Sequence, residues 1–335
     1  MTDTDQQLIE RFDSRAERRS ERREFFRTAL GAGAIAAVGA TAVAIGSTAA
    51  AQATDNDAAI LNFALNLEYL EAQFYSFAAT GAGLPNALLT PGSASTTTQG
   101  AVSGGRQVSF TDPLVAQYAR EIAADEVAHV TFLRNQLGTA AVAQPAIDIG
   151  STATSAFSVA AQAAKIVAAG AAFDPYANDE NFLQAAFLFE DVGVTAYRGA
   201  SSLLTSKVYL EAAAGILAAE AYHASIIRTV LYTKGLQTPA LRTNTDAISN
   251  VRDAFDGASD DDQGISATVI ANSQLPALNG LTASNIVPTG QDGLSYGRTT
   301  GNVLNILYLN TLAVAKGGFF PNGVNGSIAT STATT

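Results

Sequence analysis

Both histidines of the chain lie in the same short motif, in which a glutamate precedes the histidine by three residues. Glu126 and His129 form the first copy, and Glu220 and His223 form the second. On an α-helix, residues three apart project from the same face, so each motif offers a carboxylate and an imidazole to one point. These two ligand types suit iron, manganese or zinc. Two such motifs, with one inward glutamate from each of two other helices, would form a dinuclear metal site in a four-helix bundle.

Two further segments each place a glutamate inside an apolar stripe. Glu68 follows Leu61 and Ala64 at helical spacing, and Glu190 follows Phe187 by three residues. A carboxylate buried in such a stripe is costly unless it is paired or bound to a metal. The predicted metal ligands are therefore Glu68, Glu126, His129, Glu190, Glu220 and His223.

Four residues near these ligands have roles that the sequence leaves open. Glu71 lies three residues after Glu68 and is either an auxiliary or rival ligand or a residue at the solvent edge of the stripe. Tyr75 and Tyr197 each follow an inward glutamate by seven residues, and are either redox participants or ordinary core residues. Asp125 is expected to be a surface acid, with a hydrogen bond to an imidazole as the alternative.

Four long helices must position these residues, and the sequence marks most of their ends. Pro113 follows capping residues, Asn178 is a further cap, and Gly138 is a stop signal. The predicted segments run from Thr54–Asp57 to Gly81, from Pro113 to Gly138, from Asn178 onward, and from about Ser206 to Lys234. The connection 139–178, with a short helix expected at about 155–169, is long enough for the third helix to run parallel to the second. We therefore predict an all-α protein whose residues 54–236 form a four-helix bundle.

Residues 237–335 are predicted to form an extension that packs on the bundle. They are rich in Gly, Asn, Ser and Thr, and short helices are expected at about 246–255 and 302–315. Their apolar segments are too few to build a separate core. The acidic run from Asp260 to Asp262 is expected to be solvated surface.

Residues 1–53 have the order of regions found in an export signal. An Arg-rich part precedes the uncharged run 29–51, which closes on the A-x-A site of Ala51–Ala53. Residues 22–27 resemble the twin-arginine export motif, although Glu21 replaces the usual hydroxyl residue. We expect cleavage and a periplasmic or extracellular protein, with a retained membrane anchor as the alternative.

Composition excludes several other classes of site and partner. The chain has no Cys, which rules out disulfides, iron–sulfur clusters and thiolate zinc sites. Its formal net charge of −11 argues against binding to nucleic acid or to anionic lipid.

The order of the six ligands resembles the ferritin-like superfamily of diiron carboxylate proteins. The stretch 61–75 is similar to the first helix of bacterioferritins, and 64–72 and 317–323 resemble the exported desiccation-related branch of the superfamily. The resemblance implies a ferritin-like bundle with two iron or manganese ions per chain. It also implies that two of the four carboxylates bridge the metals.

Three functions remain open. The first is a redox enzyme acting on dioxygen or hydrogen peroxide, either a ferroxidase or a peroxide-consuming oxidase or catalase. The second is a protein that sequesters metal without catalysis, and the third is a desiccation-protective protein stabilised by its metal. We expect no nucleic acid partner and no stable membrane insertion after signal removal, and a homo-oligomer remains open.

Overall fold

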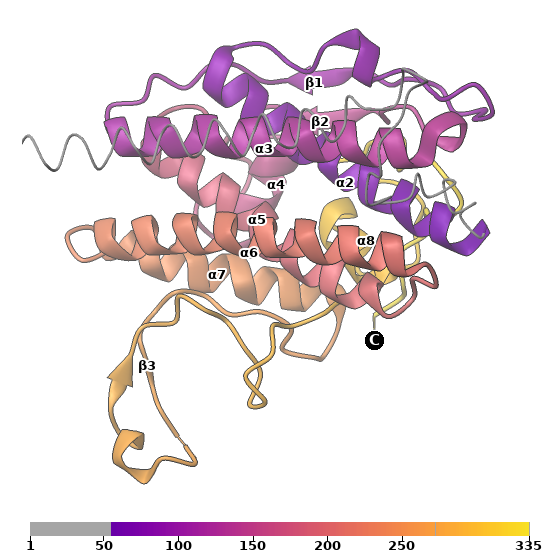
Figure 1. The fold of residues 1–335 in the computed structure, drawn as a ribbon. Coiled ribbons are helices and arrows are strands. Elements are labelled where there is room, and N and C mark those ends of the chain that lie inside the picture. The colour runs from indigo at the N-terminus through magenta and orange to yellow at the C-terminus, as the bar shows by residue number, and fades with distance from the viewer. Residues whose placement is uncertain (1–54, 272, 335) are drawn as a thin grey trace, which may run out of the picture. The chain divides into compact units, whose positions relative to one another are not determined.

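The computed structural model describes residues 55–271 and 273–334, and the predicted export signal lies outside them. Four long helices dominate the described part of the chain (Figure 1): α2 (Asp55–Thr80), α3 (Pro113–Leu137), α5 (Asp179–Ser201) and α6 (Lys207–Lys234). They confirm the prediction of an all-α protein built on a helical bundle. None of the described helices combines the length and the apolar character needed to span a membrane.

Local side-chain chemistry fixes the ends of these helices. Asp112 caps α3 by accepting a hydrogen bond from the Leu114 amide, and Pro113 occupies the first turn, where no amide donor is needed. Gly138 ends α3 with a positive φ of 54°, a conformation that a glycine adopts without strain. Asn178 caps α5 through its side-chain oxygen. These boundaries agree with the predicted ones because caps depend on neighbouring residues only.

The long helices pack as two pairs. Helix α2 lies along α3, and α5 lies along α6; the pairs meet where α2 contacts α5 and α3 contacts α6. Fully buried apolar side chains such as Leu65, Phe74, Ile122, Phe182 and Ile227 fill the space between the helices. The interior is therefore shared by all four helices.

Two long connections cover one side of α2 and α3. The first contains η1 (Asn86–Leu88) and β1 (Val102–Gly104), and the crossover contains η2 (Gly138–Ala140), β2 (Ile147–Ile149) and α4 (Ala156–Ala163). Strands β1 and β2 pair in parallel. Helix α4 ends earlier than the predicted 155–169, because Gln162 uses its amide group to bind the carbonyls of Ala153 and Ala171 and so holds the following residues in a turn.

The extension contains α7 (Ala240–Asp256) and α8 (Thr300–Tyr308), joined by an arm with β3 (Thr268–Val269), η3 (Pro276–Leu278) and β4 (Thr282–Ala283). Helix α7 packs on α5 and α6, and α8 packs on α5 and α7. Helix α7 is longer than predicted. Helix α8 is shorter, because Leu309 adopts a left-handed conformation and ends it.

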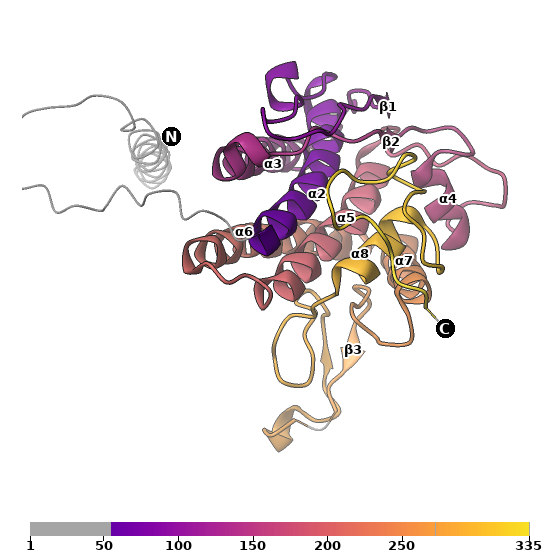
Figure 2. The same ribbon diagram turned by 90° about the vertical axis from the view of Figure 1, so that its right-hand side faces the viewer.

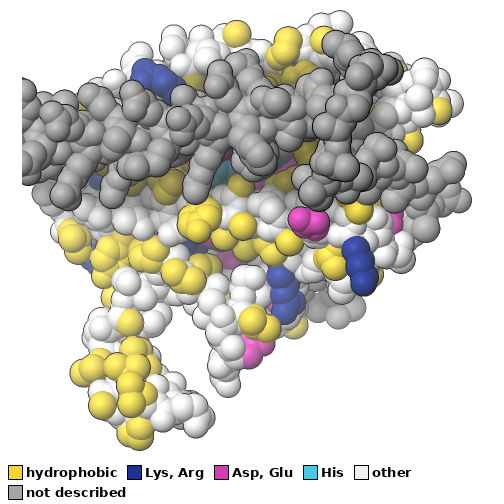
Figure 3. Space-filling view, in the orientation of Figure 1, with side chains coloured by type: hydrophobic (Ala, Val, Ile, Leu, Met, Phe, Trp, Pro, Cys, Tyr) yellow, Lys and Arg dark blue, Asp and Glu magenta, His cyan; other side chains and the backbone are white. Residues whose placement is uncertain are grey.

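The arm projects away from the helices in both ribbon views (Figures 1 and 2). Hydrophobic side chains gather on it in the space-filling view (Figure 3), and Val269, Leu275 and Leu281 are all more than half exposed. Within the described part of the arm, β3 and β4 pair antiparallel.

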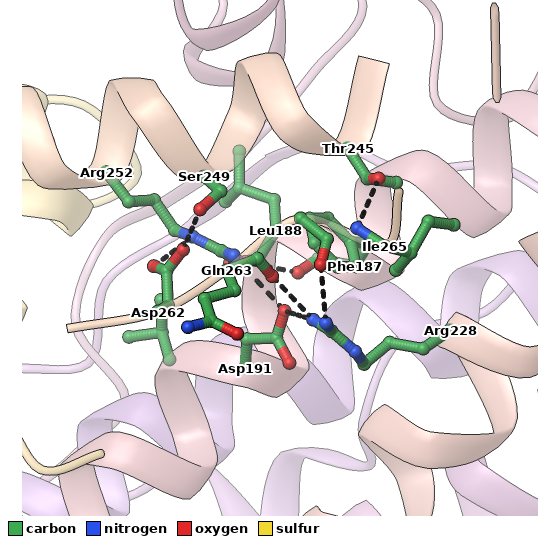
Figure 4. A network of polar contacts seen from close by, with 12 residues as sticks. Phe187, Leu188, Asp191, Arg228, Thr245, Ser249, Arg252, Asp262, Gln263 and Ile265 are labelled. Atoms are coloured by element: carbon green, nitrogen blue, oxygen red, sulfur yellow. Dashed lines mark hydrogen bonds and ion pairs between the residues drawn. The ribbon is translucent and has the colours of Figure 1, made fainter. Parts of the chain in front are cut away.

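The expectation that the acidic run 260–262 is solvated is wrong for Asp262. This carboxylate is buried and lies 2.8 Å from Arg252 Nε and 2.7 Å from an Arg298 terminal nitrogen. The network around it joins α7 and the following segment to α5 and α6 (Figure 4). Arg298 lies 36 residues after Asp262, and Arg252 lies on α7, beyond the turn that ends this helix, so the acidic run itself could not reveal either partner.

The two helix pairs are internal counterparts of each other. Asp57 in α2 and Asp179 in α5 each lie eleven residues before the inward glutamate of their helix. Asp57 accepts a 2.8 Å hydrogen bond from the Thr205 amide before α6, and Asp179 accepts one of 3.1 Å from the Thr111 amide before α3. Each pair therefore fixes the start of a helix in the other pair by the same contact.

Candidate metal centre

The six predicted ligands meet in the interior of the bundle. Two overlapping groups have one ligand atom from each member within 4.8 Å of all the others: Glu68, Glu126, His129 and Glu220 in one, and Glu126, Glu190, Glu220 and His223 in the other. Glu126 and Glu220 belong to both groups. Two ion positions that share two carboxylates are the arrangement expected of a dinuclear site with bridging carboxylates.

Each helix contributes to this cluster in the way that helical spacing predicts. Glu68 comes from α2 and Glu190 from α5, whereas α3 and α6 each supply one glutamate and one histidine. All four glutamates have 0% exposure. The side chain of His129 is 12% exposed and that of His223 is 4% exposed, so the cluster approaches solvent on the histidine side.

Both imidazoles point their Nδ1 atoms into the cluster. The Nδ1 of His129 lies 3.1 Å from a Glu68 oxygen, and 3.6 and 3.7 Å from oxygens of Glu126 and Glu220. The Nδ1 of His223 lies 3.1 Å from Glu126 and 3.5 Å from Glu190. The ring centres are 6.1 Å apart. Each imidazole therefore faces one of the two possible ion positions.

Several buried atoms of the cluster lack hydrogen-bond partners among the described residues. They are both carboxylate oxygens of Glu126 and of Glu220, Oε2 of Glu190 and Nδ1 of His223. Buried polar atoms without partners are rare because each one forfeits its hydration. Carboxylate oxygens and imidazole nitrogens that converge in this way are the donors that divalent iron, manganese or zinc accepts. The residues present therefore fit a metal centre.

The pKa values of the cluster show that its buried carboxylates need positive charge beside them. Burial raises the pKa of Glu68 to about 7 and also raises the pKa values of Glu190 and Glu220. Burial acts to lower the pKa of His129, but Glu68 and Glu126 outweigh it and raise that pKa to about 12. The metal-free cluster thus offsets its carboxylates with protons, and divalent cations can replace them.

Glu126 is the exception among the four glutamates. Burial alone would raise its pKa, but the imidazoles of His129 and His223 outweigh burial and lower the pKa of Glu126. It lies between both histidines, and it is the most readily ionised acid of the cluster. This position suits a carboxylate that is shared by two cations.

Glu71 is a fifth buried carboxylate beside the cluster rather than a residue at the solvent edge of its stripe. It is 5% exposed, and burial followed by the charges of Glu126 and Glu190 raises its pKa well above the usual value. Its counterpart on α5 is Gly193, where a Cβ would come 2.4 Å from a Glu220 oxygen and 3.5 Å from a Glu71 oxygen. The glycine leaves the space that both carboxylates occupy, and sequence analysis did not single it out.

The two tyrosines bind the carboxylates of the opposite helix pair. The hydroxyl of Tyr75 in α2 donates a hydrogen bond to Glu190 in α5, and the hydroxyl of Tyr197 in α5 donates to Glu68 in α2. Burial, followed by the carboxylate in contact, raises the pKa of each tyrosine well above its ordinary value. Both hydroxyls therefore stay protonated and serve as donors that orient a carboxylate.

Asp125 is not merely a surface acid. Its side chain is 45% exposed, yet one carboxylate oxygen lies 3.4 Å from Nε2 of His223. A carboxylate in this position favours the tautomer with its proton on Nε2, which leaves Nδ1 free to bind a metal. The counterpart of Asp125 on α6 is Ala219, so His129 has no equivalent carboxylate there. Only the tertiary contact between α3 and α6 distinguishes this role from that of a solvated acid.

Comparison with known proteins agrees with this geometry. Residues 56–233 match the family described as a ferritin-like domain. The chain is 30% identical over 282 residues to the ferritin-like catalase Nec2 of Nesocodon mauritianus, covering 82% of this chain and 85% of the relative. It is 28% identical over 276 residues to the desiccation-related protein PCC13-62 of Craterostigma plantagineum, covering 81% and 83%. No solved structure matches the chain.

Proposed function

Because the chain belongs to the ferritin-like domain family, we propose that it binds two iron or manganese ions in the candidate metal centre and uses them to consume hydrogen peroxide. The observation that carries the proposal is the sharing of Glu126 and Glu220 by two four-residue groups. The name of the relative Nec2 favours peroxide over other oxidants. Iron or manganese held in the centre would supply the redox chemistry for converting two molecules of H₂O₂ into two of H₂O and one of O₂.

The protein's own residues hold the ions and control what reaches them. Glu68 with His129 and Glu190 with His223 would each hold one ion, and Glu126 and Glu220, which belong to both groups, would help to hold both. Tyr75 and Tyr197 fix the two terminal carboxylates through their hydroxyl groups. All four carboxylates are fully buried, and the side chain of His129 is the most exposed of the six ligands at 12%.

Asp125 is the acid best placed to move protons between the centre and solvent. It is partly exposed and contacts Nε2 of His223, so it can pass a proton between bulk water and the imidazole. The consumption of hydrogen peroxide requires such proton transfers, because O–H bonds of peroxide break and O–H bonds of water form.

The decisive test measures metal content and turnover on the same purified protein. We expect about two ions per chain after loading with Fe²⁺ or Mn²⁺, and oxygen release from H₂O₂ that depends on the metal. Glu126→Ala should abolish turnover while circular dichroism shows an intact bundle. Turnover that survives this substitution would contradict a role for the centre in catalysis. Oxidation of Fe²⁺ by O₂ without peroxide consumption would instead indicate a ferroxidase.

The second candidate function is a non-catalytic, metal-stabilised protein that protects cells during desiccation. The similarity to the desiccation-related protein PCC13-62 favours it. In that case the protein would bind the same two ions and gain thermal stability, but neither H₂O₂ nor O₂ would be consumed.

We further propose that residues 1–53 direct export by the twin-arginine route to the periplasm or beyond. Detection of the processed chain, beginning near Thr54, in the exported fraction would test this.

A further inference from the structure

A pocket of about 250 Å³ lies between α5, α6 and the segment 286–296. Its helical wall consists of Asp191, Val194, Thr195, Ala221, Ala224, Ser225 and Arg228. None of the six predicted metal ligands lines it. Ala221 and Ala224 directly follow Glu220 and His223 in the sequence and are therefore turned about 100° away from them on α6. The pocket is thus a second site, on a different face of the helices that hold the metal ligands.

The internal repeat provides a comparison for this pocket, because α2 and α3 have a groove of their own at the same place. There Tyr69, directly after Glu68, donates a hydrogen bond to the carbonyl of Leu88. Gln73, five residues after Glu68, donates to the side chain of Gln144. Both residues are buried and fill the groove against the two long connections.

The counterparts in α5 and α6 have smaller side chains. Asp191 stands in place of Tyr69, and Thr195 in place of Gln73. On the other helix of each pair, Val127, Val130 and Thr131 of α3 correspond to Ala221, Ala224 and Ser225 of α6. Val194 is the exception, since its counterpart is Ala72. The groove is therefore filled in one helix pair and hollow in the other, and unfilled volume ordinarily costs stability.

The charges in the pocket wall are already satisfied within the protein. The guanidinium of Arg228 donates to Asp191 and to the backbone carbonyls of residues 263, 264, 285 and 286, which uses all five of its N–H groups. Asp191 also accepts from Arg252, and Asp262 accepts from Ser249 (Figure 4). Asp262 accepts from Arg298 as well. An ionic ligand would find no unpaired charge here, and its desolvation would be uncompensated.

The same hydrogen bonds hold the outer wall in place. Arg228 anchors the segment that covers the groove through the carbonyls of Asn285 and Ile286, at 2.6 and 3.0 Å. Further along this wall, the Tyr296 hydroxyl donates to the carbonyl of Thr289. A wall anchored in this way keeps the pocket open without a ligand, and preformed pockets bind small molecules at low entropic cost.

We propose that this pocket binds a small neutral organic molecule, mostly apolar and bearing a hydroxyl group, of the size of one or two aromatic rings. Most of the surface exposed inside the pocket is apolar, with contributions from Val194, Ala224 and Ile286. The hydroxyl groups of Ser225 and Thr289 also line it and can serve as hydrogen-bond partners. For scale, a cavity of about 150 Å³ holds benzene, so this pocket has room for a larger ring system.

Three probes with the same ring and different charge test the proposal: 2-naphthol, 2-naphthoate and 2-naphthylmethylammonium. Binding to the purified chain is measured by calorimetry or by ligand-detected NMR at pH 7, with and without loaded metal. We expect saturable binding of 2-naphthol at least tenfold tighter than that of either ion, and unchanged after metal removal. Equal or tighter binding of the anion or the cation, or no saturable binding of 2-naphthol below 1 mM, would overturn the proposal.

A matched pair of substitutions on α6 locates the binding. Ala221→Phe places a ring in the mouth of the pocket, whereas Ala218→Phe adds the same ring at an exposed position that does not line it. We expect Ala221→Phe to weaken 2-naphthol binding more than tenfold and Ala218→Phe to leave it unchanged. Ala224→Val copies the side chain of the filled groove and should weaken binding to a lesser degree. If both phenylalanine variants are folded and bind equally well, the pocket is not the site.

Discussion

At the residue scale, the centre combines a nearly two-fold symmetric set of ligands with two departures from symmetry. Each imidazole faces the terminal glutamate of its own helix pair, and each terminal glutamate accepts a hydrogen bond from a tyrosine of the opposite pair. Symmetry fails at Glu71, whose counterpart is Gly193, and at Asp125, whose counterpart is Ala219. The two ion positions are therefore chemically different, and substitutions should affect them unequally.

Loss of either imidazole should empty one position of the centre. We expect His129→Ala and His223→Ala each to lower the metal content from about two ions per chain to about one, because each removes the only nitrogen ligand of its group. Elemental analysis after dialysis measures this. The exposed neighbour Tyr222, changed to Ala, serves as a control and should leave the content at about two. An unchanged content in both histidine variants would refute the ligand assignment.

Asp125→Asn should weaken one ion position more than the other. The amide no longer supplies a charged acceptor to Nε2 of His223, so the tautomer that presents Nδ1 to the metal is less favoured. We expect the weaker of two dissociation constants, from competition with a chelator, to rise about 10–100-fold. Glu211→Gln, on the exposed side of α6, is the matched change of acid to amide. Equal effects of the two substitutions would argue against any special role of Asp125.

Gly193→Ala should disturb the centre although it adds only a methyl group. The new Cβ would meet a Glu220 oxygen at 2.4 Å, so this bridging carboxylate must shift. We expect metal content to fall below about two ions per chain with the helical content retained. Gly215→Ala in α6 meets nothing within 4 Å and should instead stabilise the protein by about 0.5–1 kcal/mol. Full metal binding by Gly193→Ala would show that the glycine is not required for space.

At the element scale, buried arginines attach the extension to the bundle. Arg252 of α7 lies 3.1 Å from Asp191 of α5 and 2.8 Å from Asp262, and its guanidinium stacks 4.7 Å from the ring centre of Phe187. Asp191 directly follows Glu190, so the network contacts α5 next to a predicted metal ligand. The extension therefore supports the helix that carries this ligand.

Arg252→Met should destabilise the protein strongly, because it removes one of the two arginines that each of the buried carboxylates of Asp191 and Asp262 contacts, and so leaves the buried network short of one positive charge. We expect a loss of about 3–5 kcal/mol in the free energy of unfolding, measured with urea. Arg242 of the same helix also stacks on an aromatic ring, that of Tyr232, but it is partly exposed. Arg242→Met should cost less than about 1 kcal/mol. Similar losses in both variants would mean that the buried network is not what holds α7.

At the scale of the whole molecule, the centre makes stability depend on pH and on metal. The pKa of Glu68 is about 7 in the folded, metal-free protein and near 4.5 when unfolded, and the pKa of His129 is raised from 6.5 to about 12. The folded state therefore binds more protons than the unfolded state at Glu68 as pH rises above 4.5, and at His129 as pH rises above 6.5. Stability of the metal-free protein must then fall with rising pH.

We expect the melting temperature of the metal-free protein to decrease steadily from pH 5 to pH 9. The lowered pKa of Glu126 does not oppose this trend, since its contribution is complete above pH 4.5. Bound metal removes the excess protons, so the loaded protein should lose little stability over the same range. Calorimetry of the metal-free and the loaded protein tests this. In the Glu68→Gln variant, the melting temperature of the metal-free protein should fall less steeply with pH. A metal-free protein that grows more stable toward pH 9 would contradict the charge assignment of the cluster.

The sequence by itself determined the parts of this protein that depend on short spacings along the chain. Helical periodicity and caps such as Asp112, Pro113 and Asn178 act among neighbours, so they marked the four long helices, and the Glu-x-x-His spacing identified ligands on one face. Only the tertiary structure decided which side chains meet across helices. The contact of Asp125 with His223, the burial of Asp262, the space at Gly193 and the hollow groove beside α6 all depend on contacts between different helices or segments. Their energies come from burial and charge in the folded interior, which no local pattern encodes.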